Sequence, residues 1–237
     1  MRYEEKNLRH ELKFYINYHE YYTLKQRLKY FMELDSFVPE YEGYHVRSLY
    51  FDDVYDSSLY EKNSGVNRRQ KYRIRIYNKS DSKIRLERKS KYGQYISKET
   101  AILTRQEYND LVIENKSDFL IESQDMLKRN FYFEIRHNLM KPKVIVDYER
   151  EAFLLGAGNV RITFDKKLEA GIDSIDILEC EPATVRILPE SVLILEIKYD
   201  DFLPGLIKNL IQFTSHDISA ISKYVMCREA LNDLTMK

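Results

Sequence analysis

Charged and apolar residues alternate with a period of two in several stretches of this chain of 237 residues, and most of the charged positions are basic. Arg73 and Arg75, for example, alternate with Tyr72, Ile74 and Ile76. A β-strand sends successive side chains to opposite faces, so each stretch predicts a strand with one apolar and one ionic face. The same alternation occurs at 8–16, 84–89, 160–165 and 195–199. If the ionic faces point toward one another, the fold encloses a charged tunnel; if they point to solvent, it is an ordinary sheet packed on helices.

The apolar periodicity predicts the elements along the chain. β-Strands are expected at 8–16, 44–52, 70–78, 82–90, 94–102, 143–151, 159–165, 175–182 and 192–199. Helices are expected at 18–33, 56–62, 104–115, 118–139, 204–212 and 217–234. Short polar turns between neighbouring strands favour antiparallel pairing, and closure of the sheet would remove its exposed edges. We therefore expect an α+β fold, a closed antiparallel β-barrel with helices packed outside it.

Composition narrows the class of protein. An aromatic content of 13% argues against disorder, and only 7 glycines and 5 prolines argue against Gly-rich phosphate loops and long linkers. No composition shift divides the chain, so residues 1–237 are expected to form a single domain. The start, Met1-Arg-Tyr-Glu-Glu5, does not resemble a signal peptide, and no apolar run approaches about 18 residues, so no membrane span is expected. Cys180 and Cys227 match no metal-ligand spacing and are expected to stay thiols in the cytoplasm.

Lysines and arginines recur at the ionic positions of several predicted strands and near the C-terminus. The set is Lys13, Arg73, Arg75, Lys89, Arg150, Arg161, Lys198 and Lys223. Arginine is notable here, because lysine would serve solubility equally well while guanidinium offers a planar fork matched to phosphate oxygens. Cations that face one another repel unless a polyanion or water lies between them. The pattern therefore predicts a ligand of high negative charge density, such as a phosphate chain or a nucleoside triphosphate. The balance of 38 basic and 38 acidic residues does not oppose this, because a basic interior can coexist with an acidic exterior.

Acidic residues interrupt the basic faces at Glu11, Glu87 and Glu196. Triphosphates normally bind together with Mg²⁺ or Mn²⁺, which take carboxylate and phosphate oxygens as ligands. Glu196 is the first candidate for a metal ligand, because it lies on the ionic face beside Lys198. Glu11 and Glu87 are further candidates, although each could instead pair with a neighbouring Lys or Arg. The expected cofactor is therefore Mn²⁺ or Mg²⁺.

A series of short segments in a fixed order makes the chain similar to a known family. They are Arg9-His-Glu-Leu-Lys-Phe14, Val46-Arg-Ser-Leu-Tyr-Phe-Asp52, Lys71-Tyr-Arg-Ile-Arg75, Leu86-Glu-Arg-Lys89, Ser97-Lys-Glu-Thr100, Tyr148-Glu-Arg150, Val160-Arg-Ile-Thr-Phe-Asp165, Leu195-Glu-Ile-Lys198 and Ile221-Ser-Lys-Tyr224. Together they resemble the VTC domain, the polyphosphate polymerase module of the vacuolar transporter chaperone complex, and in particular its bacterial stand-alone relatives. The resemblance implies a triphosphate tunnel metalloenzyme fold that makes inorganic polyphosphate from ATP with a divalent ion such as Mn²⁺.

The resemblance also implies roles for individual residues. The phosphate-binding basic residues of the family correspond to Lys13, Arg73, Arg75, Lys89, Arg150, Arg161 and Lys223, helped by Tyr148 and Ser222, and its metal-binding glutamate corresponds to Glu196. Lys98 and Lys198 are additional tunnel candidates. The segment Arg9-x-Glu11-x-Lys13 departs from the Glu-x-Glu-x-Lys signature of the triphosphatase and adenylate cyclase branch of this fold. That departure favours the polymerase branch.

Three functions stay open from the sequence. The favoured one is a polyphosphate polymerase that transfers the γ-phosphate of ATP to a growing inorganic polyphosphate chain. A tunnel triphosphatase that hydrolyses a nucleoside triphosphate or inorganic triphosphate is the second, because water could replace the chain end. A non-catalytic polyphosphate-binding module is the third, and Glu196 disfavours it because anion binding gains nothing from an inward acid. Nucleic acid is not expected as a partner, since no aromatic–basic RNA-recognition motif is present, and a membrane partner for polymer export is left open.

Overall fold

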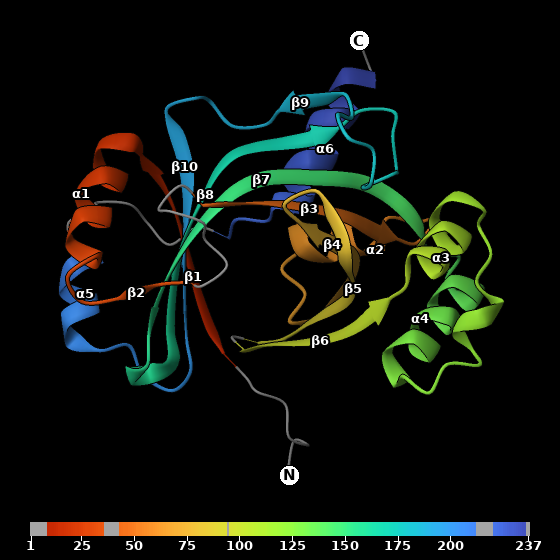
Figure 1. Cartoon of the computed structure of the whole chain (residues 1–237), viewed down its shortest axis with the longest axis horizontal. Coiled ribbons are helices and arrows are strands. Elements are labelled where there is room, and N and C mark those ends of the chain that lie inside the picture. The colour runs from red at the N-terminus through yellow and green to blue at the C-terminus, as the bar shows by residue number, and fades with distance from the viewer. Residues whose placement is uncertain (1–8, 36–42, 94, 212–219, 236–237) are drawn as a thin grey trace.

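The computed structural model describes residues 9–35, 43–93, 95–211 and 220–235, which form an α+β fold built on one antiparallel sheet (Figure 1). Its strands are β1 (His10–Asn17), β2 (Glu33–Leu34), β3 (Tyr44–Asp52), β4 (Arg68–Tyr77), β5 (Ser80–Tyr92), β6 (Tyr95–Leu103), β7 (Lys141–Leu155), β8 (Val160–Gly171), β9 (Thr184–Arg186) and β10 (Val192–Tyr199). Its α-helices are α1 (Tyr18–Leu28), α2 (Ser57–Asn63), α3 (Arg105–Tyr108), α4 (Met126–His137), α5 (Gly205–Ile211) and α6 (Lys223–Thr235). A π-helical turn, η1 (Asn109–Ile113), and two 3₁₀ turns, η2 (Asp118–Leu120) and η3 (Ala157–Asn159), lie between them. Within the described ranges no helix combines the length and apolar character needed to cross a lipid bilayer.

The sheet curls until its two edge strands approach each other. Its strand order is β1-β10-β8-β7-β3-β4-β5-β6, with β2 paired to β7 and β9 paired to β8. No continuous ladder of hydrogen bonds joins β6 back to β1. The two edges meet at one isolated bridge, where the amide of Arg9 donates to the carbonyl of Ile96 (3.2 Å) and the amide of Ile96 donates to the carbonyl of Arg9 (3.1 Å). The α+β class is thus confirmed, whereas the closed barrel is not.

Four helices cover the outer, apolar face of the sheet on two sides of the molecule (Figure 1). α1 and α5 pack over β1, β8 and β10, where Leu24 and Ile207 are fully buried. α3 and α4 cover β3 to β6. There the ring of Phe131 stacks on Tyr72 and meets Phe51 edge-on, with both ring centroids 5.0 Å away. These contacts fix which face of each strand points inward.

α6 departs from the expectation that helices pack outside. Its Tyr224 and Val225 belong to an apolar cluster with Val144 and Val146 of β7. Val146 lies two residues before Tyr148, so both project from the same, inward face of the strand. The inward face of β7 is apolar at Val144 and Val146 and polar at Tyr148 and Arg150, and α6 buries the apolar part at its start. The first residues of α6 therefore reach the ionic interior.

Two expected elements are wrong for identifiable reasons. The predicted strand at 175–182 is a loop, and Arg47 Nη1 donates to the carbonyls of Ile177 (3.2 Å) and Glu179 (2.6 Å), so a side chain satisfies groups that a strand would have paired. The predicted helix at 118–139 is interrupted, because Asp125 accepts from the amide of Leu127 (2.8 Å) and starts α4 afresh. Residues 8, 94, 212 and 217–219, at the ends of other predicted elements, lie outside the described residues.

Candidate functional site

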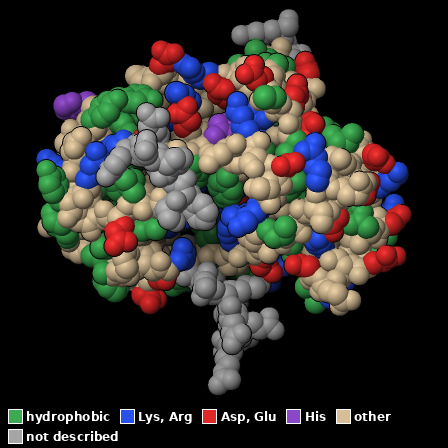
Figure 2. Space-filling view, viewed as in Figure 1, with side chains coloured by type: hydrophobic (Ala, Val, Ile, Leu, Met, Phe, Trp, Pro, Cys, Tyr) green, Lys and Arg blue, Asp and Glu red, His purple; other side chains and the backbone are tan. Residues whose placement is uncertain are grey.

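The inward face of the curled sheet encloses a cavity of about 470 Å³. Figure 2 shows a hollow near the centre of the face in view, with Lys and Arg side chains beside it. The predicted site residues that line the cavity are Glu11, Lys13, Arg73, Arg75, Lys89, Lys98, Tyr148, Arg150, Arg161, Glu196, Lys198, Ser222 and Lys223. Glu87 does not line it. Among the described residues of the lining, Glu11 and Glu196 are the only acids, so the cavity is strongly basic.

Arg75 is a buried cation whose hydrogen-bond partners are hydroxyl groups. Its Nε donates to Ser48 Oγ (2.8 Å) and its Nη2 donates to the hydroxyl of Tyr148 (3.1 Å). The register of β3 and β4 places Ser48 directly opposite Arg75. Two hydroxyls orient the guanidinium without neutralising it. Its full charge is therefore available to an anion in the cavity.

Arg150 and Lys223 share one buried carboxylate, that of Asp165. Arg150 Nε and Nη2 donate to the two oxygens of Asp165 (2.6 and 2.8 Å), and Lys223 Nζ lies 2.5 Å from Oδ2. The β7–β8 register places Arg150 opposite Asp165. Burial opposes ionisation of Asp165, but Arg150 and Lys223 hold its pKa at about 2. Two positive charges thus share one negative charge beside Tyr148, whose ring lies 5.2 Å from the Arg150 guanidinium and 5.1 Å from the Lys223 ammonium.

The N-terminus of α6 adds further positive character to this part of the cavity. Lys223 is its first residue, and the hydroxyl of the preceding Ser222 accepts from the amide of Val225 (3.5 Å). Lys13 Nζ donates to the carbonyl of Ile221 (3.2 Å), which ties the start of the helix to β1. The first amides of a helix lack partners within the helix, and its dipole favours negative charge at this end. A phosphate group near Ser222 would meet both effects.

Glu11 and Glu196 flank the ammonium group of Lys13. Lys13 Nζ lies 3.0 Å from Glu11 Oε1 and 3.7 Å from Glu196 Oε2, while Lys89 Nζ lies 2.7 Å from Glu11 Oε2 and Lys198 pairs with Glu196. Burial raises the pKa of both carboxyls, and their mutual repulsion raises that of Glu11 further. The lysines outweigh these effects, holding the pKa of Glu11 at about 2 and that of Glu196 well below its ordinary value. Both side chains are therefore carboxylates at neutral pH.

Two carboxylates on one patch fit a divalent ion that takes its other ligands from phosphate oxygens and water. In the described part of the chain, no group of three or more His, Cys, Asp or Glu side chains gathers to hold a metal unaided. Glu87 differs from Glu11 and Glu196 because it does not line the cavity, and its oxygens accept from Arg73 Nε (2.8 Å) and Lys98 Nζ (2.9 Å). Glu11 and Glu196 are thus placed to bind a metal together with phosphate. The metal role predicted for Glu87 receives no support from its position.

Arg73 and Arg161, which line the cavity, are oriented by neighbouring side chains. Arg73 Nη1 donates to the hydroxyl of Tyr50 (2.8 Å). Arg161 Nη2 donates to Asp35 Oδ2 (2.5 Å) and to the hydroxyl of Tyr44 (2.9 Å). Fixed guanidinium groups lose little entropy when they bind an anion, so these contacts prepare the wall for a ligand.

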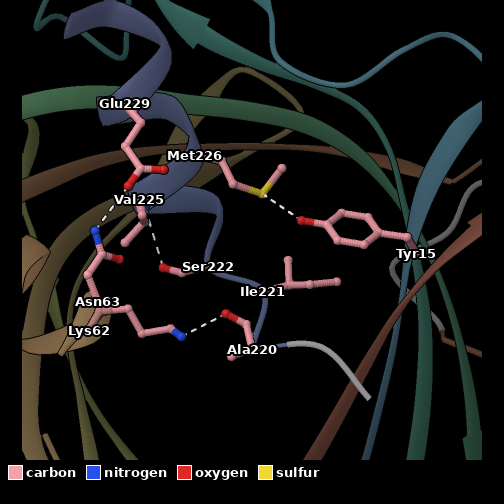
Figure 3. Close-up of a pocket in the computed structure, with 9 residues that line it drawn as sticks. All are labelled: Tyr15, Lys62, Asn63, Ala220, Ile221, Ser222, Val225, Met226 and Glu229. Carbon is pink, nitrogen blue, oxygen red and sulfur yellow. Dashed lines mark hydrogen bonds between the residues drawn. The ribbon is translucent and has the colours of Figure 1, made fainter. Parts of the chain in front are cut away.

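A smaller pocket of about 270 Å³ lies beside the cavity (Figure 3). The two share Lys62 and residues 220–222, and Lys62 Nζ donates to the carbonyl of Ala220 (2.7 Å). Tyr15 and Met226 form its opposite side, where the tyrosine hydroxyl lies 3.5 Å from the methionine sulfur. Of the predicted site residues only Ser222 lines this pocket, so the cations of interest belong to the larger cavity.

The sequence profile of the VTC domain family matches residues 8–232. The chain belongs to the VTC domain family. Among solved structures, the PH1819 protein from Pyrococcus horikoshii OT3 is similar to this VTC domain at 14% identity, covering 94% of this chain and 99% of that one, with a TM-score of 0.49. A candidate adenylate cyclase from Bacillus halodurans is similar at 12% identity, covering 92% and 95% of the two chains, also with a TM-score of 0.49. Likeness at this level carries no information on activity, and no curated protein matches the sequence.

Two acids that pair with cavity-lining cations of the VTC domain, Asp165 and Asp35, were missed from the sequence. Asp165 follows Arg161 and Thr163 on β8 at a spacing of two residues, so the three share one face and the two-residue period did mark Asp165 as inward. Asp35 carries no such signal, because it lies 126 positions from its partner Arg161 and outside any alternating stretch. Partner acids of this kind become visible only when the strands are placed in register.

Basic residues at one end of β4 and β5 were also missed. Arg69, Lys71 and Lys91 line the cavity of the VTC domain together with the predicted residues. Each continues an alternation already noted, since Arg69 and Lys71 precede Arg73 at a spacing of two and Lys91 follows Lys89. The signal was therefore present, and only the extent of the ionic face was underestimated.

Proposed function

We propose that this VTC domain is a polyphosphate polymerase that transfers the γ-phosphate of ATP to the end of an inorganic polyphosphate chain. The observation that carries the proposal is the grouping of Arg75, Arg150 and Lys223 around Tyr148. Arg150 and Lys223 share one carboxylate, that of Asp165, and Arg75 pairs only with hydroxyl groups. Buried cations in excess of acids are costly unless an anion compensates them. Membership of the VTC family supports polyphosphate as that anion.

In the proposed reaction an oxygen of the terminal phosphate of the chain attacks the γ-phosphorus of ATP in line. A new phosphorus–oxygen bond forms, the bond from the γ-phosphorus to the bridging oxygen breaks, and ADP leaves with that oxygen. The attacking oxygen is already ionised, so no side chain is needed as a base. Phosphoryl transfer depends on positioning and on neutralising the equatorial oxygens, which are tasks for Arg75, Arg150 and Lys223.

Glu196 and Glu11 are the residues that would hold Mn²⁺ or Mg²⁺, since both are ionised and line the cavity. The bound ion would supply positive charge to phosphoryl oxygens. Lys13, between the two carboxylates, keeps them deprotonated and close together.

Product analysis tests the proposal. Purified protein is incubated with ATP and Mn²⁺ or Mg²⁺, and long polyphosphate, ADP and orthophosphate are measured. Polymer and ADP in parallel support a polymerase. Orthophosphate without polymer indicates a triphosphatase, and no turnover at all indicates a binding module; either result refutes the proposal.

A matched pair of variants tests the site. Arg75→Gln should lower kcat at least about 100-fold, because it removes one fixed cation from the transferring phosphate. The fold should persist, since the partners of Arg75 are hydroxyls that an amide can still bind. Arg105→Gln removes the same charge from an exposed pair with Asp81 (2.9 Å) and should leave turnover unchanged. Wild-type turnover in Arg75→Gln would show that the site assignment is wrong.

A further inference from the structure

The three basic residues Arg69, Lys71 and Lys91, here called the β4–β5 cluster, extend the cavity beyond the proposed reaction site. The register places Arg69 directly opposite Lys91 and Lys71 directly opposite Lys89. Like charges directly opposite each other in an antiparallel pair destabilise a sheet. Two such pairs follow one another on the inward face, and a bound anion would reduce the repulsion between their charges.

Acids act on the β4–β5 cluster without forming an ion pair with it: Glu61 on Arg69, Asp52 on Lys71 and Glu11 on Lys91. Among the residues that the structure describes, none of its members forms a salt bridge. By contrast, Lys89 pairs with Glu11 at 2.7 Å and Arg150 pairs with Asp165 at 2.6 Å. The cavity thus has one region whose cations are held by carboxylates and a neighbouring region whose cations are not.

Lys71 shows the lack of compensation most clearly. Its Nζ is buried without a hydrogen-bond partner among the described residues, and it lies 4.4 Å from the centre of the Tyr224 ring. Burial, followed by repulsion from Arg69, lowers the pKa of Lys71 to about 7, although Asp52 acts in the opposite direction. The charged and titratable groups that act on it are Asp52 of β3, Arg69 of β4, Lys89 of β5, Glu61 and Lys62 of α2, and Tyr224 of α6. This buried ammonium group lacks an acceptor beside a basic cavity, and a bound anion would supply one.

The inward cations of β4 form a continuous row. Arg75, Arg73, Lys71 and Arg69 follow one another at every second residue. Inward residues of a strand are about 7 Å apart, so the row extends for about 20 Å. Three linked phosphoryl groups cover only part of that length.

We propose that the β4–β5 cluster is a second phosphate subsite, which binds phosphoryl groups of a polyphosphate chain beyond those held by Arg75, Arg150 and Lys223. Because of this second subsite, the protein should bind long inorganic polyphosphate more tightly than tripolyphosphate. The inference rests on the proposed function in taking inorganic polyphosphate as the ligand, but it concerns binding and not turnover.

Calorimetric titration of the full chain with tripolyphosphate and with long-chain polyphosphate, both without ATP, tests this subsite. Wild type should bind the long chain more tightly, and Lys71→Met or Arg69→Gln should each weaken long-chain binding about tenfold while changing tripolyphosphate binding less than about twofold. Arg68→Gln is the matched control, because Arg68 is the neighbouring residue of β4, is exposed and projects from the opposite face. It should change neither affinity.

Proton uptake gives a second readout. At pH 8 the unliganded Lys71 is mostly neutral, and a bound phosphate should restore its proton. Wild type should therefore take up more protons with long polyphosphate than with tripolyphosphate, as measured in buffers of different ionisation enthalpy. Lys71→Met should abolish this difference, whereas Lys71→Arg should keep the long-chain preference, because it retains the charge.

Equal affinity of wild type for the two ligands, or equal weakening of both by Lys71→Met, would overturn the second subsite. These outcomes differ from failure of the proposed function. If wild type binds long polyphosphate more tightly through Lys71 but makes no polymer from ATP, the proposed polymerase activity is refuted and the second subsite is not.

Discussion

Replacing Asp165 by asparagine removes the carboxylate that Arg150 and Lys223 share. In the folded protein the pKa of Asp165 is about 2 against an ordinary value of 3.8, a difference that corresponds to stabilisation on the order of 2 kcal/mol. Removing one partner of a buried ion pair typically costs about 3–5 kcal/mol, because the other charge stays buried and unpaired. We therefore expect Asp165→Asn to lower the unfolding free energy at pH 7 by about 3 kcal/mol. For a chain of this length that loss lowers Tm by about 6–12 °C.

Denaturant unfolding of wild type and Asp165→Asn measures this loss. A lowered pKa means that the contribution is present above the ordinary pKa of 3.8 and is lost as the pH falls through about 2. The difference between the two proteins should therefore shrink below about pH 4. Asp81→Asn, which breaks only the exposed pair with Arg105, should cost less than about 1 kcal/mol.

Tripolyphosphate should act more strongly on the variant than on wild type. In Asp165→Asn the ligand would neutralise Arg150 and Lys223 in place of the lost carboxylate, so the ligand-induced rise in Tm should be larger. A loss of stability no greater than that of Asp81→Asn, or an equal ligand effect in both proteins, would refute the claim that Asp165 balances cations in a phosphate site.

Two further predictions concern packing and pH. Phe131→Ala should lower the unfolding free energy in urea by about 3–5 kcal/mol, because this ring is fully buried between Tyr72 and Phe51; a loss below about 1 kcal/mol would contradict the described layer. The pKa of Lys71 is about 7 when folded and 10.5 ordinarily, so the unfolded chain binds more protons between these values and ligand-free stability should rise with pH. Between pH 7 and 9, the unfolding free energy of wild type should rise by about 2 kcal/mol relative to that of Lys71→Met. A difference between the two proteins that does not change with pH would contradict the lowered pKa of Lys71.

The inward cations could be recognised from the sequence because a strand's faces follow from residue parity. Arg73, Arg75 and Lys89 occupy alternating positions opposite apolar residues, and the apolar face had to meet the helices. Burial of Tyr72 and Ile74 on the outer side then fixed the direction of their neighbours. The same parity would have included Lys71 had the alternation been followed to the start of β4.

Other features depend on contacts that no local pattern encodes. Ile175 and Ile177 alternate with polar residues as in a strand, yet the amide of Ile177 donates to the hydroxyl of Tyr108 (2.9 Å) and not to a neighbouring strand. Closure of the barrel depends on how many residues of the two edge strands pair with each other. Within the described residues these edges share one bridge, between Arg9 and Ile96. The period of an amphipathic helix does not say which face of the sheet it covers, so the inward packing of α6 at Tyr224 could not be predicted.

The decisive experiment is to determine the structure of crystals grown with long-chain polyphosphate. We predict a chain of phosphoryl groups inside the cavity, with oxygens about 3 Å from the side-chain nitrogens of Arg75, Arg150 and Lys223. Polyphosphate bound only to the outer surface, or an empty cavity at saturating ligand, would contradict the conclusion that the inward cations form the polyphosphate site.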